Sequence, residues 1–165
     1  MRSDQNACEH LARLYAEGQG VAKDGAHAAE LRDRICASGV YDVCNVLGIQ
    51  YDKGNGVPKD AKRAAALYQK ACDANEVAAC VNLGEVTADG RGVPRSLAGA
   101  VALFKKSCST TNWGESMGCA GLGLTYEKGL GVPVSRTKAI ELYRKGCKGG
   151  SEWFCKRLTA LGARP

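Results

Sequence analysis

Residues 44–72 read CNVLGIQYDKGNGVPKDAKRAAALYQKAC, and the pattern of this stretch returns along the chain. Its first cysteine belongs to a series at positions 8, 44, 80, 119 and 155, and its last cysteine belongs to a second series at positions 36, 72, 108 and 147. Both series advance by 36 residues, apart from one shared step of 39. Because self-similarity at a fixed period is the signature of a tandem array, we expect a repeat protein.

The first half of each repeat has helical periodicity. Counted from the first cysteine of a repeat, leucine recurs at offset three, a small residue recurs at offset four, and tyrosine recurs at offset seven in three repeats. Offsets 0, 3, 4 and 7 lie on one face of an α-helix. The pattern predicts a first helix in successive repeats over roughly 6–17, 43–53, 79–89 and 117–128.

The second half of each repeat is predicted to be another helix. A glycine pair such as Gly54 and Gly56 follows each first helix, and in three repeats Val-Pro comes directly after it. Glycine just past a helix and proline soon after it are stop signals. Residues that favour the N-cap then follow, namely Asp24, Asp60, Ser96 and Ser135. The second helix should end near the second cysteine, where its negative dipole end suits Lys70, Lys106 and Lys145.

Length and composition exclude several classes of protein. The chain has 165 residues, which is typical of one domain, and its hydrophobic content of 45% excludes intrinsic disorder. With 23 Lys and Arg against 17 Asp and Glu, it is only mildly basic, so we expect no nucleic acid as partner. No apolar stretch approaches the roughly 18 residues needed to span a bilayer, so we expect no membrane insertion.

The repeat resembles a known family. Its unit, C-x2-L-G-x2-Y-x2-G-x-G-V-P-x-D-x3-A-x2-L-Y-x-K-x-C, is seen most fully from Cys44 to Cys72 and resembles the Sel1-like repeat. The regular cysteines resemble one branch of that family, the Helicobacter cysteine-rich proteins. The resemblance implies an all-α fold, a right-handed α/α superhelix (solenoid) of TPR-like helical hairpins, and a role as an adaptor for protein partners.

The resemblance covers nearly the whole chain. It implies a single Sel1-like repeat domain over 1–165, with repeats at about 8–43, 44–79, 80–118 and 119–154 and a C-terminal capping helix at 155–165. The first repeat departs most, since Gly20-Val21-Ala22 lacks the proline and Arg32 stands where the other repeats have Tyr or Phe.

The cysteines are expected to form disulfides between neighbouring repeats. One cysteine closes a second helix and the other opens the next first helix, so a short connection brings both to one end of adjacent antiparallel helices. The expected pairs are Cys36–Cys44, Cys72–Cys80, Cys108–Cys119 and Cys147–Cys155. Zinc binding and dithiol redox chemistry are weaker interpretations, because the chain has no CxxC and its two histidines are isolated. No metal or cofactor is therefore expected.

Cys8 has no expected partner within the chain, since the position 36 residues before Cys36 lies immediately upstream. We therefore expect Cys8 to be unpaired, the chain to be part of a longer protein, and a dimer through Cys8 to be one form of association. Disulfides also favour an oxidising compartment, either secreted or periplasmic. A cytoplasmic location is the alternative if the cysteines are reduced.

The resemblance raises one catalytic alternative, because some members of the cysteine-rich branch are described as penicillin-binding with weak β-lactamase activity. Residues 135–138 read SRTK and match the SxxK of serine β-lactamases. However, Ser135 stands in the N-cap position of its repeat, and the SDN and KTG motifs that accompany SxxK are absent. We therefore expect no catalytic residue.

A partner is expected on the face of the first helices opposite the core. Offsets 2, 5, 6 and 9 lie about half a turn from the core face, and their residues vary between repeats. In related helical-hairpin repeats such helices line the concave side, and the mixed charge here suits an extended peptide or protein segment. A structural spacer with an ordinary solvent-exposed face is the alternative. The predicted partner-binding residues are Arg13, Val46, Ile49, Gln50, Lys53, Asn82, Glu85, Asp89, Leu124 and Lys128.

Overall fold

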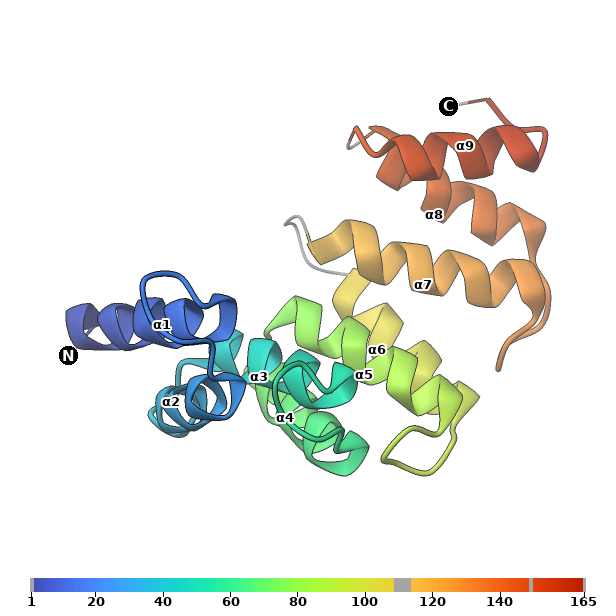
Figure 1. The fold of residues 1–165 in the computed structure, drawn as a ribbon. Helices are drawn as coiled ribbons and strands as arrows, with labels where there is room; N and C mark the ends of the chain where they lie inside the picture. Colours follow the sequence, from blue (N-terminus) through green and yellow to red (C-terminus); the bar gives the residue numbers. More distant parts are fainter. Residues whose placement is uncertain (1, 109–113, 149, 165) are drawn as a thin grey trace. The chain divides into compact units, whose positions relative to one another are not determined.

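The computed structural model describes residues 2–108, 114–148 and 150–164, and every regular element in these ranges is an α-helix (Figure 1). The first helices of the repeats are α1 (Arg2–Glu17), α3 (Tyr41–Lys53), α5 (Val77–Asp89) and α7 (Gly114–Lys128). The second helices are α2 (Gly25–Ala37), α4 (Ala61–Asp73), α6 (Leu97–Cys108) and α8 (Arg136–Lys148), and α9 (Glu152–Ala160) follows them. The prediction of an all-α fold of helical hairpins is confirmed.

Contacts between residues divide the chain into two compact units. The N-terminal unit comprises Met1–Ala79 and Arg91–Val93, and the C-terminal unit comprises Cys80–Gly90 and Pro94–Pro165. In the N-terminal unit, α2 packs against α1 and α3, and α3 packs against α4. In the C-terminal unit, α7 packs against α6 and α8, and α8 packs against α9. Within each unit the helix pairs in contact are therefore neighbours in sequence, as expected for a repeat array.

The predicted caps fix the start of each second helix. Asp24 Oδ1 accepts a hydrogen bond from the backbone N–H of His27 at 2.9 Å, and Asp60 Oδ1 does the same for Arg63 at 2.9 Å. In the C-terminal unit the cap is a hydroxyl, and Ser96 Oγ accepts from the N–H of Gly99 at 3.0 Å. Each bond satisfies a backbone donor that the helix itself leaves unpaired.

The paired glycines end the first helices as predicted. Gly54, the C-cap of α3, has a φ of 73° in the left-handed region, and its N–H donates to the carbonyl of Gln50 at 2.9 Å. Gly56 has the same φ, and a Cβ there would lie 2.6 Å from the Cα of Gly25. The second glycine thus allows two loops to pack closely as well as allowing the turn.

Three repeats have an aromatic ring packed directly on a helix backbone. Tyr68 is 2% exposed, and a Cβ added to Gly48 would lie 2.6 Å from its Cε1 atom. The pairs Gly84 with Phe104 and Gly123 with Tyr143 repeat this contact. In the first repeat the corresponding residues are Ala12 and Arg32, both buried. The glycine and the ring therefore occur together, because the ring occupies the space that a side chain would need.

The disulfide prediction is confirmed for the eight cysteines concerned. The Cα atoms are 4.8 Å apart in Cys36–Cys44, 4.6 Å in Cys108–Cys119 and 4.8 Å in Cys147–Cys155. Cys72 and Cys80 are also disulfide-bonded, whereas Cys8 has a free, exposed thiol. The residues inserted between Cys108 and Cys119 fall largely within 109–113, outside the described residues.

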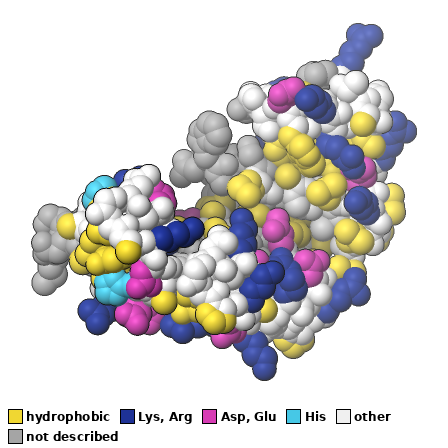
Figure 2. Space-filling model, in the orientation of Figure 1, with side chains coloured by type: hydrophobic (Ala, Val, Ile, Leu, Met, Phe, Trp, Pro, Cys, Tyr) yellow, Lys and Arg dark blue, Asp and Glu magenta, His cyan; other side chains and the backbone are white. Residues whose placement is uncertain are grey.

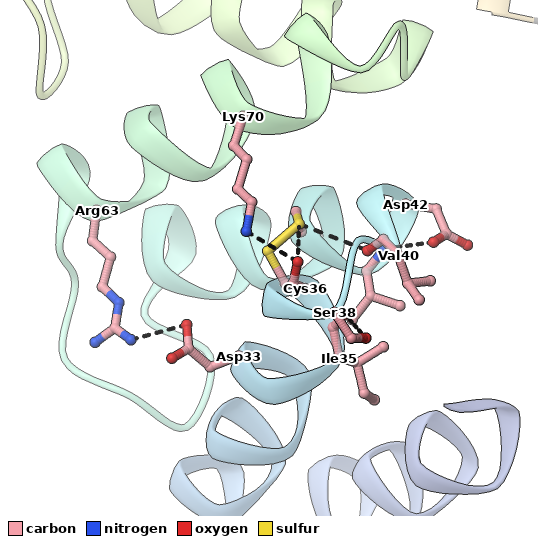
Figure 3. The surroundings of a disulfide bond; sticks show 10 residues. Asp33, Ile35, Cys36, Ser38, Val40, Asp42, Arg63 and Lys70 are labelled. Atoms are coloured by element: carbon pink, nitrogen blue, oxygen red, sulfur yellow. Dashed lines mark hydrogen bonds and ion pairs between the residues drawn. A yellow bond between two sulfur atoms is a disulfide. The ribbon is translucent and has the colours of Figure 1, made fainter. Parts of the chain in front are cut away.

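Lys70 lies in the last turn of α4, as predicted, and its ammonium also reaches the end of another helix. Its Nζ donates a hydrogen bond at 3.0 Å to the carbonyl of Cys36, in the last turn of α2, and not to the end of its own helix α4 (Figure 3). The ammonium thus caps the preceding repeat, directly beside the Cys36–Cys44 bridge. A cation at the C-terminal end of a helix is favourable wherever it comes from in the sequence.

Candidate partner-binding site

The predicted partner-binding residues fall in both units and differ in exposure. Six are exposed, namely Arg13, Val46, Lys53, Glu85, Asp89 and Lys128. Ile49, Asn82 and Leu124 are partly buried, and Gln50 is buried. On the face drawn in Figure 2, basic and acidic side chains are interspersed.

Gln50 departs from the exposed face that its helical register predicts. It is only 5% exposed, and the residues at the same offset in the next two repeats, Val86 and Thr125, are 2% and 5% exposed. A first helix packs against second helices on two sides. The buried part of its surface is therefore wider than the face formed by offsets 0, 3, 4 and 7. Offset six therefore belongs to the interior, and the stripe of exposed residues is narrower than predicted.

Val46, Ile49 and Gln50 nevertheless come together in the N-terminal unit, where they line a cavity of about 450 Å³. Its volume lies within the range of about 300 to 1,000 Å³ that is common for ligand pockets. The remaining lining residues come from α1, α2 and the loops after α1 and α3: Ala16, Lys23, Gly25, Arg32, Gly54, Asn55 and Gly56. Arg13 and Lys53 do not line it.

A hydrogen-bonded chain of side chains forms part of the cavity wall. Arg32 is 7% exposed, and its Nε donates to Glu9 at 3.2 Å and 3.4 Å from the two carboxylate oxygens. Its Nη1 donates to Gln50 Oε1 at 3.0 Å, and Gln50 Nε2 donates to the carbonyl of Gly25 at 2.8 Å. The burial of Gln50 is explained by these two bonds, which satisfy its amide on both sides.

Sequence reasoning did not include Arg32 or Lys23 among the partner-binding residues. Lys23 stands in a variable loop and gives no periodic signal. Arg32 does give one, because it breaks the aromatic position held by Tyr68, Phe104 and Tyr143. Within a repeat array, a charged residue at a position that is otherwise aromatic indicates a local function or a local packing change.

A second polar cluster lies in the C-terminal unit, between α7, α8 and α9. Tyr143 Oη donates to Glu127 Oε2 at 2.7 Å, and Arg157 forms an ion pair with Glu127 Oε1. Burial raises the pKa of Glu127, but the hydrogen bonds from Arg157 and Tyr143 and the nearby positive charges outweigh it, so the pKa lies below its usual value. Burial and the bond to Glu127 raise the pKa of Tyr143. The cluster thus favours an ionised Glu127 and a neutral Tyr143.

Replacement of Arg157 by Met is expected to lower the free energy of unfolding by about 1 kcal/mol at pH 7, because the pair is half-buried and partly screened. A carboxylate with a depressed pKa stabilises the fold above its unfolded-state pKa, and that contribution is lost as the pH falls through its folded-state pKa. The difference between variant and wild type should therefore shrink on acidification, as measured by urea unfolding at pH 7 and pH 3. Lys148→Met, which removes an exposed charge from the same unit, is the control. A pH-independent difference would contradict this account.

Both polar residues of the SxxK sequence have structural contacts. Ser135 Oγ accepts from the backbone N–H of Lys138 at 3.4 Å, so the hydroxyl lies at the start of α8 as an N-cap. Lys138 Nζ lies 5.0 Å from the centroid of the Tyr126 ring, in a cation–π contact. The nitrogen that would activate the serine in such a motif has another partner here.

Neither a metal-binding cluster nor a membrane-spanning helix occurs in the described residues. Within residues 2–108, 114–148 and 150–164, no three His, Cys, Asp or Glu side chains gather where they could hold a metal ion. In the same ranges, no helix has the length and apolar character needed to cross a membrane.

Similar solved structures share this fold. The chain is similar to c5321, a protective antigen of uropathogenic Escherichia coli strains with an SLR fold, at a TM-score of 0.86 and 26% identity over 97% of this chain and 34% of that one. It is also similar to a Sel1 repeat protein from Oxalobacter formigenes, at a TM-score of 0.83 and 24% identity over 98% of this chain and 68% of that one. The chain therefore spans about a third of the length of the Escherichia coli antigen.

The cysteine-rich protein B of Helicobacter pylori is similar as well, at a TM-score of 0.62 and 22% identity over 81% of this chain and 99% of that one. Comparison with curated proteins gives no significant match. The family model for the Sel1 repeat matches residues 5–38, 42–76, 77–109 and 116–151, which is most of the sequence. The helical hairpins and the matched repeats together assign the chain to a family: it belongs to the Sel1 repeat family.

Proposed function

We propose that the chain is a non-catalytic scaffold that binds a peptide or protein segment on the face formed by its first helices. Sel1 repeats generally mediate protein interactions, and this chain has the repeat over most of its length. The observation that carries the proposal is the cavity that Val46, Ile49 and Gln50 line together. Val46 is 39% exposed, so it offers apolar surface to a partner beside this cavity.

The disulfides support rigid presentation of this face. A scaffold that is already ordered loses less conformational entropy on association than a flexible one. Disulfides persist in oxidising compartments, so we propose that the protein is secreted or periplasmic. The exposed thiol of Cys8 further supports a covalent dimer as a form of association, which a non-reducing gel of wild type and Cys8→Ser would test.

The proposal is tested by selecting peptides from a random library displayed on phage against the oxidised protein. Selected peptides should bind at least about tenfold more weakly to Val46→Asp, because a charge would then face the apolar part of the peptide. Val134→Asp is the matched control, since Val134 is 67% exposed and lies outside the cavity. It should bind the peptides as wild type does. Failure to select any peptide, or equal binding by Val46→Asp, would contradict the proposed function.

A further inference from the structure

We infer that the cavity of the N-terminal unit binds a carboxylate group of a peptide, with Arg32 as the principal donor. The inference rests on the proposed function, because it names the chemical group by which that face recognises its partner. Arg32 lines the cavity and is 7% exposed, so its guanidinium is held in place and largely removed from bulk water.

The donors of Arg32 are only partly used inside the protein. A guanidinium has five N–H groups. Glu9 accepts from Nε and Gln50 accepts from Nη1, which leaves one N–H on Nη1 and both on Nη2 without an acceptor among the described residues. These atoms are not among the buried side-chain atoms that lack a partner, so they are open to the cavity that Arg32 lines. An acceptor that enters the cavity would gain a charge-assisted hydrogen bond from them.

The charges around the cavity favour a single anionic group. Two lining residues are cationic, Lys23 and Arg32, and none is acidic. Glu9, which is outside the lining, balances one of these charges through its ion pair with Arg32. One positive charge remains to be neutralised. A planar carboxylate matches the planar fork of the guanidinium better than a spherical ion does.

The remaining wall favours a peptide as the source of that carboxylate. Ala16, Val46 and Ile49 supply apolar surface beside the guanidinium. A peptide residue can place a carboxylate on Arg32 and its aliphatic atoms on this surface at the same time. The carboxylate can belong to the C-terminus of a chain or to an acidic side chain.

Gln50 acts as a positioning residue in this arrangement. Its Oε1 holds Nη1 of Arg32, and its Nε2 is fixed by the carbonyl of Gly25 at the start of α2. Glu9 holds the Nε edge from α1. Side chains from α1 and α3 therefore fix the guanidinium before any ligand arrives, which lowers the entropy cost of binding.

The test is an NMR titration of the 15N-labelled oxidised protein with three small probes. The probes are N-acetyl-Ala-Val with a free C-terminal carboxylate, the same dipeptide as its amide, and N-acetyl-Asp-amide. A carboxylate probe should shift the side-chain amide of Gln50 and the backbone amides of Gly54 and Gly56, with a Kd of about 1 mM. The dipeptide amide should bind at least about tenfold more weakly. A comparison of the two carboxylate probes distinguishes a terminal from a side-chain source.

Two variants of Arg32 keep the test independent of folding. Arg32→Met preserves the aliphatic stem, and Ala12→Gly with Arg32→Tyr recreates the glycine–tyrosine pair seen at Gly48 and Tyr68. Both should lose at least about tenfold in affinity for the carboxylate probe. Arg63→Met is the control, because it removes an exposed guanidinium of α4 in the same unit.

Equal binding of the amide, full binding by both Arg32 variants, or no shift with either carboxylate probe up to about 20 mM would overturn the inference. Its failure is distinguishable from failure of the proposed function. If selected peptides depend on Val46 but bind both Arg32 variants as they bind wild type, the scaffold function stands and the carboxylate site falls.

Discussion

Full reduction of the disulfides is expected to lower the free energy of unfolding by about 10 kcal/mol. The chain segments they close are short, with sequence separations of 8 to 11 in the Cys36–Cys44, Cys108–Cys119 and Cys147–Cys155 bridges. Loop-closure entropy then gives about 2.5 kcal/mol for each bridge. Cys72 and Cys80 are disulfide-bonded as well and add to the total. A typical total stability is about 5 to 15 kcal/mol, so the reduced chain should be largely unfolded at 25 °C.

Urea unfolding followed by far-UV circular dichroism, with and without a phosphine reductant, measures this loss. Thiol titration in denaturant should rise from one thiol per chain to nine, since the sequence contains nine cysteines and Cys8 is free. Cys8→Ser provides the control, because it should leave the unfolding midpoint of the oxidised protein unchanged. A reduced protein with the oxidised midpoint would show that the bridges restrict the unfolded chain far less than loop entropy requires.

The elements that sequence reasoning predicted are those whose causes are local and periodic. The caps at Asp24 and Asp60 depend on residues three positions apart, and the glycine turn at Gly54 depends on backbone conformation at that residue. The disulfides follow in the same way from short connections between adjacent helix ends. Each of these features recurs with the 36-residue period, so several copies of the signal support the same interpretation.

The features that sequence reasoning missed depend on packing between hairpins. The first helices begin two to four residues before their predicted starts, because the periodicity of core residues marks buried positions and does not mark the first turn of a helix. The burial of Gln50 depends on Arg32 from another helix, and Lys70 reaches Cys36 of the preceding repeat. Helical register alone gives the direction of a side chain on its own helix but not what the next helix places there.

The contact between glycine and aromatic ring makes Gly48→Ala the next largest expected effect, a loss of about 2 kcal/mol in the free energy of unfolding. Alanine is the better helix former by about 1 kcal/mol, so propensity alone predicts the opposite sign. The steric cost should outweigh it, because the new Cβ would lie 2.6 Å from Cε1 and 2.7 Å from Cδ1 of the buried Tyr68 ring. Urea unfolding at pH 7 measures the difference.

A double-mutant cycle with Tyr68→Leu separates this clash from other consequences. The double variant should lose less free energy of unfolding than the sum of the losses in the two single variants. Removal of the ring frees the space that the new methyl needs. Ala12→Gly is the matched control at the same offset in the first repeat, where Arg32 replaces the ring, and it should lose only about 1 kcal/mol through helix propensity. Additive losses in the cycle, or a stabilised Gly48→Ala protein, would mean that α3 and α4 can move apart without cost. The recurrence of the glycine wherever the ring occurs would then need another physical cause.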